Sequence, residues 1–212
     1  QAIIKIKYSS ILSLTLAFAI SLYFDLFSIT QIIILFLSLS LIITSLFSGI
    51  QVSKSNIIVK SILGKTLSHA GFGLFILSVI ANATYSEEKI YDAKIKDILE
   101  LNGHKFVFEK INHVEGENYN SIQAVFNLQE DNKVVEQFMP EIRFYNDPPT
   151  ATSETSILYG LFSDIYIVMN VPQYQDSISV RIHVKPFMNF IWLSVFMIII
   201  GGVLSIIYRI KN

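Results

Sequence analysis

Four apolar runs of helical length constrain this chain more than any other feature. They cover residues 8–24, 31–50, 67–83 and 190–208. A helix needs about 20 mainly apolar residues, with about 17 as the lower limit, to cross a hydrocarbon core of roughly 30 Å. Hydrophobic residues make up 52% of the chain and charged residues only 16%. The pattern predicts an integral membrane protein with four transmembrane helices, the last within residues 188–212.

Lysine and arginine indicate how these helices are oriented. Among the short segments beside the runs, these basic residues lie before the first run, between the second and third (Lys54 among them) and after the fourth. The short loop 25–30 has none. Because short basic loops stay in the cytoplasm, we expect both ends of the chain to be cytoplasmic. Residues 87–187 are then extracytoplasmic.

The segment between the third and fourth runs reads as a separate domain with strands. Apolar residues alternate in residues 105–111 and 177–184, and residues 90–98, 121–128, 133–138, 142–145 and 164–169 are further candidate strands. Residues 153–161 are a candidate short helix. We expect a small, mainly antiparallel β sandwich or barrel, with the domain organisation 1–86, 87–187 and 188–212. The segment holds every acidic residue except Asp25, which argues against nucleic-acid binding.

His69 is the one histidine inside an apolar run. An ionisable side chain at membrane depth is costly and indicates a function. Ala70, Gly71 and Gly73 follow it, and Gly73 lies one helical turn beyond His69. Such a surface suits a flat hydrophobic cofactor, with room for it at Gly73. Small residues also let two helices approach closely, and the residues alone leave both interpretations open.

Other chemistry is poorly supported. The chain has no cysteine, which excludes disulfides, thiolate catalysis and iron–sulfur ligation. His104, His113 and His183 lack the spacing of a metal site. We expect His104 and His113 to be solvated, whereas His183 shares one side of a terminal strand with Arg181 and Lys185. The sequence contains no nucleophile elbow and no glycine-rich phosphate loop. We therefore assign no catalytic residue and expect no catalysis by this chain alone.

A polar stretch around residue 141 is a candidate partner surface. Glu141 and Arg143 are two residues apart, so in a strand they share a face and can form an ion pair. Tyr145 continues the same face. The alternative is a solvated edge strand, and the residues alone do not separate the two.

An ordered set of short motifs extends over about two-thirds of the chain. In order these are His-x-Gly at 69–71, Glu-Asn-Tyr at 117–119, Pro140-Glu141-x-Arg143-x-Tyr145, Ser153-Glu154 with Ile157, Asp-Ile-Tyr-Ile at 164–167, Val180-Arg181, Lys185-Pro186-Phe187, Ile191-Trp192-Leu193 and Gly201-Gly202. In this order, between matching membrane runs, the set resembles the C-terminal end of the CcmF/NrfE family of cytochrome c-type haem lyases.

The resemblance implies a role in covalent attachment of haem to apocytochrome c on the extracytoplasmic side. Haem would arrive on the haem chaperone CcmE, and CcmH/CcmI-type proteins would present the apocytochrome. Such lyases also carry a haem b in the membrane, held by two histidines, and a proposed role of that haem is electron transfer. His69 matches the more C-terminal of the two ligands. The expected location is a bacterial inner membrane, in preference to a mitochondrial one, with residues 87–187 periplasmic.

The resemblance is incomplete in one respect. The family's tryptophan-rich haem-handling motif is absent, because Trp192 is the only tryptophan. The resemblance also implies that the second ligand of haem b lies upstream of the matched region, and so outside this chain. We expect either the C-terminal part of a longer lyase, which the start at Gln1 favours, or one subunit of a split lyase, and in both cases the N-terminal remainder is a partner. Two alternatives stay open: a non-catalytic scaffold of a cytochrome assembly complex, and, with less support, a transporter subunit.

Overall fold

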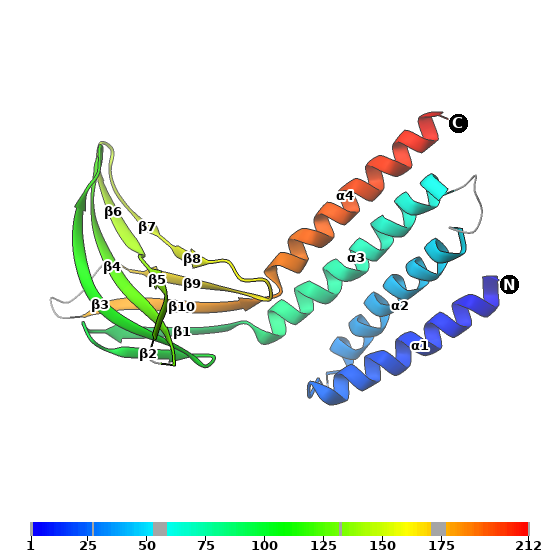
Figure 1. Cartoon of the computed structure of the whole chain (residues 1–212), viewed down its shortest axis with the longest axis horizontal. Helices are drawn as coiled ribbons and strands as arrows, with labels where there is room; N and C mark the ends of the chain where they lie inside the picture. Colours follow the sequence, from blue (N-terminus) through cyan, green and yellow to red (C-terminus); the bar gives the residue numbers. More distant parts are fainter. Residues whose placement is uncertain (1, 27, 53–58, 132, 171–176, 212) are drawn as a thin grey trace. The chain divides into compact units, whose positions relative to one another are not determined.

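A computed structural model describes residues 2–26, 28–52, 59–131, 133–170 and 177–211. The chain divides into two compact units. One comprises Gln1–Thr84 together with Phe187–Asn212, and the other comprises Tyr85–Pro186. The first is helical and the second is made of strands (Figure 1).

The helical unit has the elements α1 (Ala2–Tyr23), α2 (Ile29–Val52), α3 (Val59–Tyr85) and α4 (Met188–Lys211). In the described part of the chain, three segments are long and apolar enough to cross a membrane: Ile29–Gly49, Leu63–Tyr85 and Met188–Arg209. The predicted span in α1 and the predicted orientation stay predictions. Lys54, one of the residues on which the orientation rests, lies outside the described residues.

Small and hydroxylic residues set the packing of α1, α2 and α3. The hydroxyl groups of Ser9 on α1 and Thr44 on α2 are hydrogen-bonded at 3.1 Å. A Cβ atom at Gly73 on α3 would lie 2.8 Å from the carbonyl oxygen of Ser38 on α2. Only glycine therefore permits this approach of α2 to α3.

Small and hydroxylic residues also let α4 pack against the other side of α3. The hydroxyl of Ser68 on α3 donates to the carbonyl oxygen of Ile198 on α4 at 3.4 Å. A Cβ at Gly64 would lie 2.8 Å from the carbonyl oxygen of Gly201. The helix α3 consequently lies between α2 and α4, with α1 beyond α2 (Figure 1).

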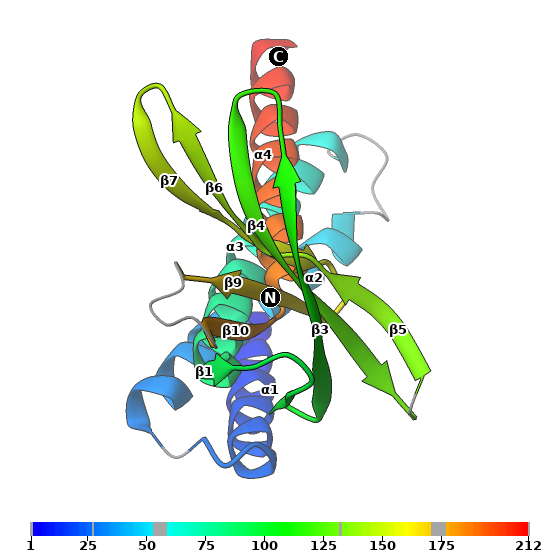
Figure 2. The same cartoon turned by 90° about the vertical axis from the view of Figure 1, so that its left-hand side faces the viewer.

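The second unit is built from strands β1 to β10. They are β1 (Glu87–Ala93), β2 (Ile98–Leu101), β3 (His104–Glu115), β4 (Tyr119–Glu130), β5 (Lys133–Phe138), β6 (Glu141–Asn146), β7 (Pro149–Glu154), β8 (Ser156–Leu158), β9 (Ser163–Met169) and β10 (Ile178–Pro186). One sheet has the order β1-β10-β9-β8, and the other has the order β2-β3-β4-β6-β7 with β5 also paired to β4. Figure 2 shows β1, β10 and β9 of the first sheet and β3 to β7 of the second. The pairings are antiparallel.

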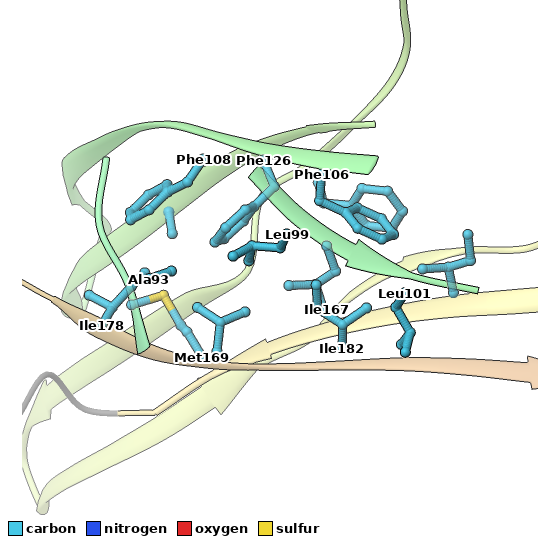
Figure 3. Close-up of a cluster of buried hydrophobic side chains, with 14 of the residues drawn as sticks. Ala93, Leu99, Leu101, Phe106, Phe108, Phe126, Ile167, Met169, Ile178 and Ile182 are labelled. Carbon is cyan, nitrogen blue, oxygen red and sulfur yellow. The ribbon is translucent and has the colours of Figure 1, made fainter. Parts of the chain in front are cut away.

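The two sheets share one hydrophobic core. Phe106 and Phe126 from the larger sheet and Ile167 and Ile182 from the smaller sheet are each fully buried in the same cluster (Figure 3). Apolar residues alternate along β10, which buries every second side chain as its sequence pattern predicted. The predicted antiparallel β domain is confirmed, as a sandwich.

Two predicted elements are wrong. Residues 90–98 are not one strand, because β1 ends at Ala93 and a turn follows in which the backbone N–H of Lys94 donates to the carboxylate of Asp97 at 2.8 Å. Residues 153–161 are not a helix but contribute to β7 and β8. Ser153 lies opposite Ile142 and Ile157 lies opposite Tyr166, and these cross-strand pairings override the weak local pattern.

Candidate functional site

His69 lies on α3, and its side chain is exposed within this chain. Its Nδ1 atom lies 2.8 Å from the carbonyl oxygen of Lys65, one turn earlier. A carbonyl oxygen can only accept, so Nδ1 carries the proton and donates it. The lone pair of the neutral imidazole is then on Nε2, which is the atom available to a metal ion.

The exposed side of α3 runs along most of the helix. Phe72 is 50% exposed and Val79 is 39% exposed, and both lie on the same side as His69. Gly71 and Gly73 are buried against α4 and α2, respectively. Helix packing therefore accounts for Gly73 within this chain, and its role in making room for a porphyrin stays a prediction.

The other three histidines lie apart in the β domain. His104 begins β3 and is half-buried, whereas His113 near the end of β3 is exposed. Neither is joined to the others in a cluster, because the described residues contain no group of three or more His, Cys, Asp or Glu that could hold a metal ion. In the described part of the domain, no metal centre is available from these residues.

His183 on β10 differs from the other two histidines of the domain. Its Nδ1 lies 3.4 Å from a carboxylate oxygen of Glu88, and only 18% of its side chain is exposed. Burial lowers the pKa of His183, Glu88 acts in the opposite direction, and the neighbouring cations Lys185 and Arg181 lower it further. Its strand, β10, lies between β1 and β9 in the smaller sheet, which accounts for this burial.

The three candidate partner-surface residues come together on β6. Glu141 is only 8% exposed, and the Nε atom of Arg143 donates to its Oε1 at 2.7 Å. The hydroxyl of Ser121 on β4 donates to the other carboxylate oxygen at 2.8 Å. The hydrogen bond to Glu141, followed by one to Tyr145, raises the pKa of Arg143 above its ordinary value. The pair is therefore fixed in place.

Aromatic rings extend this cluster. The guanidinium of Arg143 lies over the ring of Tyr119 on β4, 4.6 Å from its centroid. The rings of Tyr119 and Tyr145 are 5.6 Å apart and tilted. We call the set Ser121, Glu141, Arg143, Tyr119 and Tyr145 the β4–β6 cluster. It combines one guanidinium and two phenols on a rigid sheet, which is a composition typical of protein interfaces.

Sequence reasoning missed Ser121 and Tyr119. They join the cluster because Ser121 pairs with Arg143 and Tyr119 pairs with Tyr145 across the β4–β6 ladder. No local pattern gives that register. The one available signal was the alternation in β4, which places residues 119 and 121 on the same face of the strand.

Comparisons with known proteins agree with this architecture. Residues 84–186 match the family described as CcmF C-terminal beta-sandwich. The cytochrome c-type biogenesis protein CcmF of Pseudomonas aeruginosa is 30% identical over 72% of this chain and 24% of its own length. The cytochrome c-type biogenesis protein ccl1 of Rhodobacter capsulatus is 32% identical over 69% of this chain and 22% of its own length.

A solved structure also resembles the chain. The cytochrome c haem lyase CcmF superposes with a TM-score of 0.67 and 16% identity, covering 92% of this chain and 34% of that structure. At this identity the likeness concerns the fold. The chain spans about a quarter of the length of the curated relatives it matches.

Proposed function

Because the chain belongs to the CcmF family and matches its C-terminal part, we propose that it forms the C-terminal membrane and β-sandwich portion of a cytochrome c haem lyase. The whole lyase would transfer haem from a haem chaperone to apocytochrome c. The main observation that supports a haem-binding role for this chain is the exposed His69 imidazole on α3. Its Nδ1 is hydrogen-bonded to the carbonyl oxygen of Lys65, which leaves Nε2 to act as a ligand.

His69 would be one axial ligand of a haem b in the membrane. The donor chemistry fits, because a neutral imidazole is an ordinary haem ligand and its tautomer is set by the Lys65 carbonyl. The hydrogen bond from Nδ1 also fixes the ring orientation, which is the usual function of such a partner. When bound, the haem would supply a one-electron redox couple.

The rest of that site would come from outside this chain. The side of α3 that bears His69 is exposed, and Phe72 on that side is 50% exposed. Helices from the N-terminal remainder of the lyase can therefore pack over it. The neighbouring small residues Gly73 and Gly71 pack against α2 and α4, respectively. This arrangement supports a shared site in which the N-terminal remainder of the lyase supplies the second histidine.

The β domain would meet the other proteins of cytochrome c maturation. We propose the β4–β6 cluster as a docking surface for one of them, with the chaperone CcmE, CcmH/CcmI-type proteins and apocytochrome c as candidates. The support is the juxtaposition of Arg143 with Tyr119 and Tyr145 on a rigid sheet, because arginine and tyrosine are enriched at interface hot spots.

Three helices of membrane-spanning length and bacterial relatives support a membrane protein. We place it in the bacterial inner membrane. The β domain would lie in the periplasm, as the basic loops indicate.

The test is the haem content of the full lyase after His69→Ala. His113→Ala is a matched control, since His113 is exposed and lies in the β domain. We expect His69→Ala to lose most of its b-type absorbance at equal protein recovery, whereas His113→Ala keeps it. An unchanged b-type spectrum in His69→Ala would refute the ligand assignment. Lyase that purifies without haem before any substitution would favour the scaffold alternative.

A further inference from the structure

The loop between β8 and β9 exposes large apolar side chains. In the segment 159–162, Tyr159 is 72% exposed, Leu161 is 69% exposed and Phe162 is 62% exposed. The segment contains no charged residue. Single exposed apolar residues are ordinary on a protein surface, but three within four residues form a patch that indicates a partner.

The loop is held in a defined conformation. The backbone N–H of Gly160 donates to the carboxylate of Asp164 at 3.1 Å, and Asp164 is itself only 3% exposed. A Cβ atom at Gly160 would clash with the carbonyl oxygen of Ser163. The turn therefore requires glycine at this position, and the buried carboxylate anchors it. The fold of the domain therefore holds the exposed side chains of this loop in a defined position.

The strand register fixes which end of the smaller sheet carries this loop. Ser163, the first residue of β9, pairs with Pro186, the last residue of β10. The membrane helix α4 begins at Met188, two residues later. At the same end of the sheet, Glu87 at the start of β1 pairs with Val184, and α3 ends at Tyr85. The loop thus lies at the end of the sheet that is joined covalently to both membrane helices.

We propose that the loop 159–162 inserts into the interfacial layer of the lipid bilayer and anchors the β domain on the membrane surface. Tyrosine with neighbouring Phe and Leu side chains suits the boundary between headgroups and acyl chains. Lys185 lies at the same end of the sheet, next to Asp164 in the register. Its ammonium, 5.1 Å above the ring of Tyr166, can meet a lipid phosphate. The proposal is independent of the haem assignment, since it concerns only the membrane and the β domain.

The absence of cysteine from the chain allows a direct test by single-cysteine labelling. Leu161→Cys would carry an environment-sensitive fluorophore in the full chain, reconstituted into vesicles of phosphatidylcholine and phosphatidylglycerol. Ile95→Cys is the matched control: it is 50% exposed and follows β1, whose last residue, Ala93, pairs with Ile178 at the other end of the sheet. Tyr159→Cys is a second loop variant, and circular dichroism checks that each variant is folded.

We expect the label at residue 161 to emit at shorter wavelength, to be quenched by lipids that carry a quencher near the headgroup, and to resist aqueous iodide. The label at residue 95 should show the opposite pattern. Iodide quenching at residues 159 and 161 as strong as at residue 95 would overturn the proposal. Protection from iodide without lipid quenching would indicate a protein contact, such as a second copy of the chain, and would overturn it as well.

Discussion

The guanidinium of Arg143 binds the carboxylate of Glu141, which lies two residues earlier on the same strand, with 2.7 Å between Nε and Oε1. Ser121 on the neighbouring strand donates to the second carboxylate oxygen at 2.8 Å. Both carboxylate oxygens of Glu141 are therefore engaged within the domain. Glu141 acts as the support of the β4–β6 cluster, and Arg143 and Tyr145 are the residues that can meet a partner.

Glu141→Ala should destabilise the protein by roughly 1–3 kcal/mol, because Arg143 loses its counter-ion and the buried hydroxyl of Ser121 loses its acceptor. The measurement is thermal unfolding of the purified protein in detergent. Glu115→Ala is the control, since Glu115 is an exposed carboxylate on β3. Equal melting temperatures for the two variants would contradict the supporting role of Glu141.

Tyr145→Ala should weaken the recovery of maturation partners while leaving the melting temperature nearly unchanged, because Tyr145 is half-exposed at the edge of the cluster. Co-purification with the haem chaperone measures the effect. Val134→Ala is the control within the same domain, as Val134 is exposed on β5. If the Tyr145 and Val134 variants recover the partner equally, the cluster is not the docking surface.

The Glu141–Arg143 pair was predictable from the sequence, whereas the complete cluster was not. Two residues at spacing i and i+2 in a strand share a face, so their pairing needs only the strand itself. Ser121 and Tyr119 depend on the register between β4 and β6, which the packing of the whole sheet sets. The helices were predictable because an apolar run of their length has few alternatives.

Gly73→Ala should loosen the contact between α2 and α3, because its Cβ would lie 2.8 Å from the carbonyl oxygen of Ser38. We expect a destabilisation of about 1–3 kcal/mol, the usual cost of overpacking. Gly202→Ala is a matched control in α4, where a new Cβ would meet no atom of the described chain within 4 Å. Thermal unfolding in detergent compares them, and a tolerated Gly73→Ala would contradict the close helix contact.

The sequence leaves two interpretations of Gly73 open, for a physical reason. A glycine in a membrane helix can serve a cofactor or a neighbouring helix, and the sequence does not distinguish the two. The structure gives it a helix neighbour, Ile42 together with Ser38. The helix predicted at residues 153–161 is wrong for a related reason. The local sequence does not indicate that β7 pairs with β6 and that β8 pairs with β9.

His183 should make stability depend on pH. Its pKa in the folded protein is lowered by burial below the ordinary value of 6.5, so the unfolded chain binds the proton more tightly. Stability is then complete above pH 6.5 and falls as the pH decreases from 6.5 toward the lower folded pKa. His183→Gln should reduce this loss in melting temperature, whereas the exposed His113→Gln should retain it. Parallel curves for all three proteins would contradict the assignment.

The central claim is that Nε2 of His69 is a haem ligand, and rescue of a cavity variant tests it most directly. In the full lyase, His69→Gly should lose the low-spin b-type spectrum. Added imidazole should restore it by replacing the missing ligand next to Lys65. A spectrum that is unchanged by His69→Gly, or one that is lost and does not respond to imidazole while the protein remains folded, would contradict the claim.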